Sequence, residues 1–188
     1  MRIIAGQLRG KKLLSPKGEI TRPTADRARE TLFNILNSMF KKRGNSWSDL
    51  SFCDVFAGSG AIGAEALSRG VTKCLFFEKD PYVVSVLRKN ISEIKGGILV
   101  QSDALKPPKA RESVDVIFMD PPYSKNLWQP ALTAFYKQGY IHLKTLVIIE
   151  IDRDEIINIP NGWCLIQKRC SGRNCFLFFE QEKENISL

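Results

Sequence analysis

Short apolar runs alternate with stretches of helical periodicity from residue 50 onwards, and this alternation restricts the fold more than any other feature of the chain. The runs are almost continuously apolar, which indicates strands that are buried on both faces of a parallel sheet. The helical stretches between them would cover those faces. The expected strands are Ser51–Phe56, Lys73–Glu78, Gly97–Gln101, Val114–Met119 and Thr145–Ile151, and the expected helices are Ala61–Arg69, Pro81–Ile94 and Asn126–Lys137.

The two ends of the chain depart from this alternation. Near the C-terminus, Trp163–Arg169 and Cys175–Gln181 flank the turn sequence Ser171–Asn174, which predicts an antiparallel hairpin. Near the N-terminus, Arg2–Ala5 and Lys11–Leu14 predict a short hairpin, and a helix follows it. We therefore expect an α/β fold with a Rossmann-like, doubly wound, mostly parallel sheet of about seven strands that ends in an antiparallel hairpin.

Positive charge is concentrated at the start of the chain. Residues 1–50 carry 11 Lys and Arg against 4 Asp and Glu, so they hold +7 of the net charge of +8. We divide the chain into a small basic hairpin and helix extension, residues 1–45, and one compact unit, residues 46–188. A basic extension on a near-neutral unit predicts a nucleic-acid partner. The side chains expected to contact RNA phosphates are Arg2, Arg9, Lys11, Lys12, Arg22, Arg27 and Arg29.

Several features argue against a secreted or membrane-bound protein. The first residues contain no apolar segment of the kind found in secretory signals. The apolar stretch Leu146–Ile149 is far too short to cross a bilayer. The five cysteines are odd in number and form no C-x-x-C pair, so we expect neither a disulfide framework nor a zinc site. The sequence therefore predicts a cytoplasmic protein without a structural metal.

A glycine-rich sequence follows the first expected core strand. Gly58, Gly60 and Gly63 match the G-x-G-x-x-G pattern of nucleotide-binding loops, and Glu78 ends the next strand, where a partner for ribose hydroxyls belongs. This pattern admits an NAD(P)-dependent oxidoreductase. However, Asp54 lies four residues before the first glycine, where it would repel a pyrophosphate and attract the ammonium and sulfonium charges of S-adenosylmethionine. The sequence therefore favours S-adenosylmethionine as the cofactor.

Acidic residues occur at the ends of four successive expected strands. Because the carboxyl ends of parallel strands share one edge, we expect Asp54, Glu78, Asp103 and Asp120 to lie along the edge at which α/β proteins bind ligands. Asp103 is placed to accept a hydrogen bond from an adenine amino group. The cofactor site is expected to consist of Asp54, Phe56, Ala57, Gly58, Ser59, Gly60, Glu78, Lys79, Asp103, Ala104 and Asp120.

The sequence Asp120–Tyr123 predicts the catalytic centre. Proline has a fixed φ and no N–H, so Pro121 and Pro122 would hold the Asp120 carboxylate rigidly and leave backbone carbonyls free to accept hydrogen bonds. Tyr123 offers an aromatic face on which a flipped-out base can stack. Together these residues would bind a planar group with an exocyclic amine. Guanine matches a carboxylate through its N1 and N2 donors, although adenine methyltransferases also use an Asp-Pro-Pro-Tyr motif.

These motifs lie in a chain that resembles class I methyltransferases, and in particular the bacterial RsmD family. The resemblance covers nearly the whole chain and is most specific in residues 2–36, 54–63 and 120–123. Lys79 and the final hairpin are less characteristic of the family. The N-terminal residues that carry the resemblance are Arg2–Gly6, Arg9–Lys11, Thr21–Thr24, Asp26, Arg27, Arg29, Glu30 and Leu32–Asn34.

The resemblance implies an activity, a cofactor and a partner. Family members methylate the N2 amine of one guanine in small-subunit (16S) ribosomal RNA, so we expect the same reaction here, with S-adenosylmethionine as the methyl donor. The expected substrate is 16S rRNA within an assembled or assembling small subunit, and the expected state of the protein is a monomer.

Three other functions remain open from the residues themselves. An amino methyltransferase acting on adenine N6 or cytosine N4 of DNA or RNA shares the Asp120 motif, but a DNA enzyme needs a target-recognition domain that this short chain does not clearly hold. A nucleotide-dependent oxidoreductase is disfavoured by Asp54. A non-catalytic RNA-binding module is disfavoured because every expected acid is present. The target nucleotide is not specified by the sequence.

Overall fold

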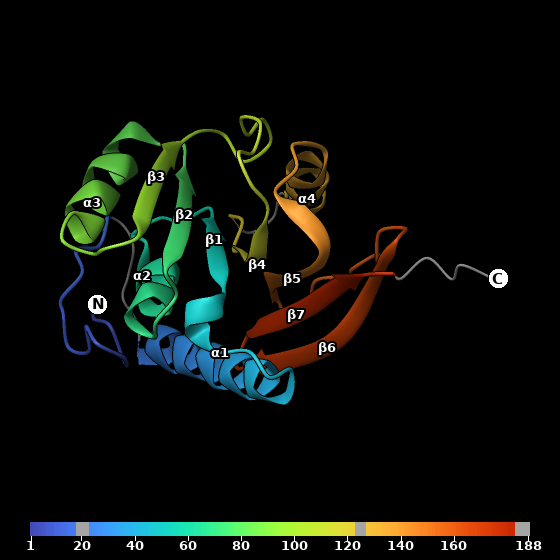
Figure 1. Ribbon diagram of the computed structural model, residues 1–188, viewed down its shortest axis with the longest axis horizontal. Helices are drawn as coiled ribbons and strands as arrows, with labels where there is room; N and C mark the ends of the chain where they lie inside the picture. The colour runs from blue at the N-terminus through green and yellow to red at the C-terminus, as the bar shows by residue number, and fades with distance from the viewer. Residues whose placement is uncertain (18–22, 123–126, 183–188) are drawn as a thin grey trace.

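The computed structural model describes residues 1–17, 23–122 and 127–182, and its centre is a seven-stranded sheet (Figure 1). The spatial order is β3-β2-β1-β4-β5-β7-β6. The first five strands are parallel, whereas β7 is antiparallel to both β5 and β6. The strands are β1 Ser51–Val55, β2 Lys73–Glu78, β3 Gly97–Gln101, β4 Val114–Met119, β5 Ile141–Asp152, β6 Trp163–Ser171 and β7 Asn174–Gln181.

Helices cover both faces of this sheet, because the central strands β1, β2 and β4 carry apolar side chains on both sides. Figure 1 shows α1 below the sheet and α4 above it. One core packs α1, α2 and α3 against a face that includes Phe76 and Phe118, and a second core packs α4 against the face that includes Phe77. The helices are α1 Pro23–Lys42, α2 Ala61–Ser68, α3 Pro81–Ile91 and α4 Trp128–Lys137, with a short 3-10 helix at Trp47–Asp49.

A buried glutamate on α2 anchors the N-terminal segment. Glu65 is fully buried, and its carboxylate accepts hydrogen bonds from the backbone N–H groups of Ile4 at 2.7 Å and Ala5 at 3.0 Å. Its charge is balanced by Arg69, whose Nε lies 2.9 Å from Oε1. Instead of the hairpin of two strands that the sequence predicts, the segment forms a single antiparallel bridge between Arg2 and Lys12.

The N-terminal extension shares its apolar core with the rest of the chain. Ile3 and Leu13 are buried in the same cluster as Leu36 of α1 and Phe52 of β1. A second polar anchor lies further along the segment, where Asn90 of α3 both accepts from the backbone N–H of residue 14 and donates to its carbonyl. The boundary that we place after residue 45 stays a prediction.

The predicted fold class is confirmed, and β2, β3 and β4 have the predicted bounds. Two boundaries differ by more than two residues. The helix α3 ends at Ile91 rather than Ile94, and β5 begins at Ile141 rather than Thr145. The early start of β5 is irregular, because its pairing with β4 shifts register between Val114 and Val116.

The final hairpin contains a disulfide that the sequence analysis did not predict. Cys170 of β6 and Cys175 of β7 form a disulfide, and they lie directly opposite each other in the strand register. Side chains opposite each other on antiparallel strands are close enough to be bridged, which the count and spacing of cysteines in the sequence do not show. Separately, none of the helices in the described parts of the chain is both long and apolar enough to cross a membrane.

Candidate active site

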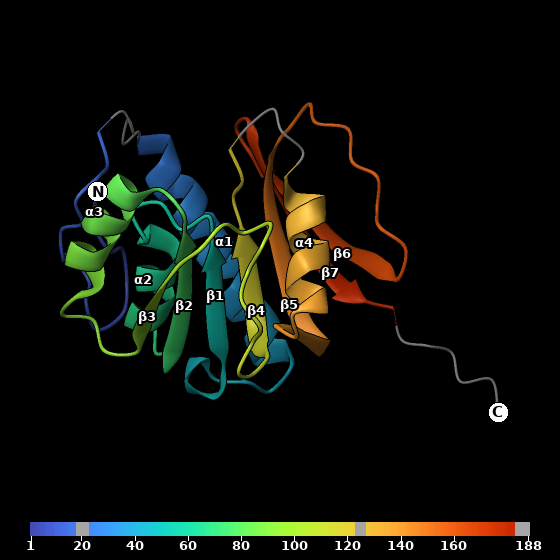
Figure 2. The same cartoon turned by 90° about the horizontal axis from the view of Figure 1, so that it is seen from above.

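The sheet reverses its direction of winding between β1 and β4, and this point is where open α/β sheets form a crevice for ligands. Figure 2 shows the parallel strands running upwards, with the carboxyl ends of β1, β4 and β5 along the upper edge. The register pairs Val55 with Met119 and with Phe77. The glycine-rich loop after β1 therefore begins beside the ends of both β2 and β4.

The glycine-rich loop has an unusual backbone. Phe56 has a φ of 64°, and among the described residues it is the only one other than glycine with a positive φ. Such a conformation costs of the order of 1–3 kcal/mol, and it occurs most often at functional sites. Gly60 has a φ of 79°, and a Cβ at Gly63 would lie 2.3 Å from the Phe76 ring. These glycines therefore let α2 begin directly after the loop and lie close against β2.

Asp54 supports the loop from below. Its Oδ2 accepts a hydrogen bond from the Gly63 N–H at 2.9 Å, and only 2% of the residue is exposed. Burial raises the pKa of the Asp54 carboxyl to about 8; the Gly63 N–H opposes this rise and the charge of Glu78 adds to it. Asp54 therefore lies buried beneath the loop, where its charge is poorly placed to attract the cofactor, and its place in the cofactor site stays a prediction. Its carboxyl fixes the start of α2.

Glu78 connects the glycine-rich loop after β1 with the loop that follows β2. One oxygen accepts from the Gly58 N–H at 3.1 Å, and the other accepts from the N–H groups of Lys79 at 2.8 Å and Asp80 at 3.0 Å. A carboxylate has about four acceptor positions, so this arrangement leaves room for one further donor. Asp54 pairs with Phe76 in the sheet, so Glu78 lies two residues closer to the carboxyl edge than Asp54 does.

Asp103 and Lys79 lie beside each other after β3 and β2. The Lys79 Nζ is 3.4 Å from Asp103 Oδ2, and Asp103 Oδ1 accepts from the Leu105 N–H at 3.0 Å. The Leu105 N–H, more than Lys79, holds the pKa of the Asp103 carboxyl below its usual value. Asp103 is therefore ionised and accessible, as an acceptor for an amino group must be. Ala104 is buried behind it.

The predicted catalytic sequence begins where β4 ends. Met119 is fully buried, Asp120 follows it at the strand end, Pro121 is buried and Pro122 is exposed. Tyr123 lies outside the described residues. Of the four predicted acids, the structure brings Glu78, Asp103 and Asp120 to the carboxyl edge, whereas Asp54 lies deeper.

The predicted RNA-contacting residues differ in how exposed they are. Arg2, Arg9, Lys12 and Arg27 are exposed, and the three arginines among them line a pocket of about 230 Å³ together with Asp26 and Glu30. The side chain of Lys11 is 28% exposed and pairs with Glu93 at 2.6 Å. Arg22 lies outside the described residues.

Arg29, in contrast to the exposed members of this set, is buried. Only 5% of the residue is exposed, and its Nη2 donates to the Arg2 carbonyl at 2.7 Å and to Asp26 at 2.9 Å. Burial lowers the pKa of the Arg29 guanidinium, and Asp26 and Glu65 oppose this effect. The side chain holds the N-terminal segment on α1, so the prediction that it contacts RNA phosphates is wrong.

Two polar residues at the edge were not identified from the sequence. Glu150 interrupts the apolar strand β5, and the Asn174 side-chain amide at the start of β7 donates to it. Burial raises the pKa of the Glu150 carboxyl to about 7. The signal was visible in the sequence, because Glu150 is an acid within an otherwise apolar run.

Comparisons with known proteins agree with this architecture. The family model described as "Conserved hypothetical protein 95" matches residues 1–180. The "Ribosomal RNA small subunit methyltransferase D" of Haemophilus influenzae is 37% identical over 92% of this chain and 89% of its own length. The protein of the same name from Escherichia coli K12 is 32% identical over 100% of this chain and 93% of its own length.

Solved structures give the same result. The structure titled "Putative methyltransferase yhhF from Escherichia coli" has a TM-score of 0.80 and 31% identity, covering 97% of this chain and 98% of its own. A putative RNA methyltransferase from Pyrococcus horikoshii, at 17% identity and a TM-score of 0.68, covers 92% of this chain and 94% of its own, and it supports the fold alone. This chain therefore belongs to the family described as Conserved hypothetical protein 95, which is the RsmD family that its sequence resembles.

Proposed function

We propose that this protein transfers a methyl group from S-adenosylmethionine to the exocyclic N2 amine of a guanine in 16S ribosomal RNA. The observation that carries the proposal is the position of Asp120, at the end of a buried strand, followed by two prolines and beside a glycine-rich loop. The names of the relatives from Haemophilus influenzae and Escherichia coli, which refer to small-subunit rRNA methylation, support it.

The hydrogen bonds of the glycine-rich loop favour S-adenosylmethionine over a dinucleotide. A pyrophosphate binds to free backbone N–H groups at such a loop. Here the N–H groups of Gly58 and Gly63 donate to Glu78 and Asp54, and that of Gly60 donates to the Ala57 carbonyl. These three N–H groups are therefore already occupied, whereas a dinucleotide needs free donors at the loop. The charge of Asp54 no longer supports this choice, because its carboxyl is buried and burial raises its pKa.

The described residues fit S-adenosylmethionine. Glu78 would accept from a ribose hydroxyl through its remaining acceptor position, and Asp103 would accept from the adenine amino group. The accessible carboxylates at this edge would also favour a ligand with a positive charge. When bound, the cofactor supplies an electrophilic methyl group on its sulfonium sulfur.

Asp120 would prepare the amine to react. The lone pair of a guanine N2 amine is delocalised into the ring, so the amine is a poor nucleophile. Hydrogen bonds from its N–H groups to the Asp120 carboxylate and a proline carbonyl would favour a tetrahedral nitrogen with its lone pair directed at the methyl group. The new nitrogen–carbon bond forms as the sulfur–carbon bond breaks, and the nitrogen then loses a proton. No strong base is needed, because the methylated ammonium is acidic, so positioning supplies much of the rate acceleration.

The exposed basic residues would bind RNA phosphates. Arg2, Arg9 and Arg27 come together around one pocket although they are distant in the sequence. We propose that the protein acts as a monomer in the cytoplasm, on 16S rRNA of an assembled or assembling small subunit.

The first prediction tests the cofactor. Replacing Glu78→Ala removes a partly buried charged acceptor, so calorimetry should show S-adenosylhomocysteine binding weakened by roughly 1–3 kcal/mol. The control Glu93→Ala removes an acid that contacts Lys11 on the surface, and it should leave binding unchanged. Wild-type protein should not bind NAD. Unchanged affinity in Glu78→Ala would remove this residue from the ribose role, and NAD binding would contradict the choice of cofactor.

The second prediction tests the catalytic role of Asp120. Replacing Asp120→Ala removes the main acceptor for the amine, so transition-state stabilisation should fall by at least about 3 kcal/mol, or more than a hundredfold in rate. Methyl transfer to small subunits from cells that lack the protein measures this rate. Cofactor affinity and the melting temperature should change much less, because the residue lies beyond the strand. A near-normal rate would refute the proposed mechanism.

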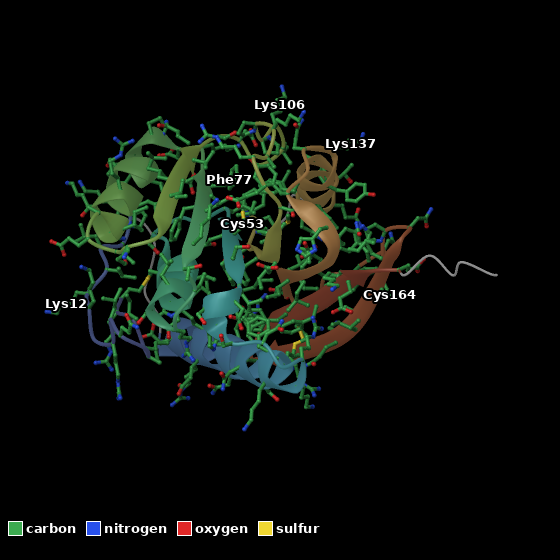
Figure 3. All side chains as sticks on the ribbon, viewed as in Figure 1. Lys12, Cys53, Phe77, Lys106, Lys137 and Cys164 are labelled. Atoms are coloured by element: carbon green, nitrogen blue, oxygen red, sulfur yellow. A yellow bond between two sulfur atoms is a disulfide. The ribbon has the colours of Figure 1, made fainter. Side chains whose placement is uncertain are left out.

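The third prediction tests the RNA surface. Arg9→Glu with Lys12→Glu should weaken RNA binding and reduce the slope of log affinity against log salt by roughly 2, because about one phosphate contact is lost at each residue. Figure 3 shows Lys12 at one end of the molecule, away from Lys106 and Lys137. The double change Lys106→Glu with Lys137→Glu makes the same charge change there and should have little effect. Equal losses in both double variants would mean that only net charge matters.

A further inference from the structure

Glu150 is a carboxylic acid inside an apolar strand. Its neighbours in β5, Ile149 and Ile151, are almost completely buried, and Glu150 itself is mostly buried. No ion pair to a cation is found for it among the described residues. Burying an acid without a cation is costly, and such groups occur mainly at functional sites. Glu150 therefore needs an explanation that packing does not supply.

The register of the sheet places Glu150 beside Asp120. Met119 of β4 pairs with Ile149 of β5, so the next residue on each strand is Asp120 and Glu150. If the alternation of the two strands continues for one more residue, Asp120 and Glu150 fall on the face of Phe118 and Ile148. Neighbouring strands lie about 4.8 Å apart. The register therefore places the two acidic residues at the same level, one residue beyond the last pair of β4 and β5.

Asn174 holds one oxygen of this carboxyl group. Its Nδ2 donates to Glu150 Oε1 from the start of β7, which is antiparallel and therefore begins at the same edge. The turn between β6 and β7 is also fixed there, because the Arg153 N–H donates to the Arg173 carbonyl at 2.7 Å. For Oε2 of Glu150, no hydrogen-bond donor is found among the described residues. A positioned carboxyl group thus has one oxygen available next to Asp120.

We propose that Glu150 is a specificity-determining residue, which accepts the N1–H of the target guanine while Asp120 accepts from the N2 amine. This inference rests on the proposed function. Guanine presents two adjacent N–H donors on one edge, and two neighbouring carboxyl groups present two adjacent acceptors. Adenine has a lone pair at N1 instead of an N–H. Its N1 would therefore place a hydrogen-bond acceptor against the Glu150 carboxylate, which is also an acceptor. A buried acceptor left without a donor is strongly unfavourable, which is how a polar site rejects an analogue that lacks one hydrogen-bonding group.

The raised pKa of Glu150 is consistent with this role. Burial raises the pKa of its carboxyl to about 7, so the ionised form gains stability from a further hydrogen-bond donor. A donated N–H stabilises the ionised form, so binding of guanine would lower that pKa again. The hydrogen bond from Asn174 already acts in this direction. The same reasoning assigns Asn174 as a positioning residue for the carboxyl group.

The test replaces the target base. Once product mapping has located the modified guanine, small subunits are reconstituted with 16S rRNA that carries 2-aminopurine there. This base keeps the exocyclic amine but has a lone pair instead of N1–H. Assayed at about pH 8.5, where the Glu150 carboxyl is ionised, wild-type enzyme should prefer guanine in kcat/KM by about tenfold or more. The Glu150→Gln enzyme should lose most of this preference, because its amide can accept from guanine N1–H or donate to 2-aminopurine N1.

A matched control uses another partly buried glutamate. Glu180 on β7 pairs with Arg43 away from this edge, and Glu180→Gln should keep the wild-type preference. Equal kcat/KM of wild-type enzyme for the two bases would overturn the proposal, whatever the variants do. An unchanged preference in a folded Glu150→Gln enzyme would also overturn it. In both cases guanine N2 would still be methylated, whereas failure of the proposed function would show as no N2 product at all.

Discussion

Two carboxyl groups from neighbouring strands hold the glycine-rich loop, and the arrangement of the site depends on them. Asp54 binds the Gly63 N–H at the start of α2, and Glu78 binds the Gly58 N–H within the loop. These bonds fix the loop beside the end of β4, where Asp120 lies. They also satisfy the donors that a phosphate would otherwise use. In our proposal, the same two interactions position the site and disfavour a dinucleotide.

A second buried acid determines where the basic surface lies. Glu65 binds the backbone of the N-terminal segment, and Arg29 binds the Arg2 carbonyl from α1. Because these polar groups are buried, their partners cannot be lost without a large cost. The segment is thus fixed to α2 and α1, and the exposed Arg9 and Arg27 line the same pocket. Arg29, which appears in the sequence as one more basic residue, instead organises the others.

The sequence predicts the fold well because its main signals are local and periodic. The bounds of β2, β3 and β4 follow from short apolar runs that end at turn residues. The sequence does not show how deeply a side chain lies in the sheet or which strands become neighbours. Asp54 and Glu78 look equivalent as acids near strand ends, but the register places Asp54 two residues deeper. Likewise, the Cys170–Cys175 disulfide and the position of Glu150 beside Asp120 depend on which strands become neighbours.

Identification of the methylated atom tests the central claim most directly. Small subunits from cells that lack this protein would be incubated with the purified protein and S-adenosylmethionine carrying a labelled methyl group, and the 16S rRNA would then be digested to nucleosides for mass spectrometry. Our account predicts one labelled product, N2-methylguanosine, which is absent before incubation. A label on adenine, cytosine or another atom of guanine would contradict the account, as would no transfer to these subunits.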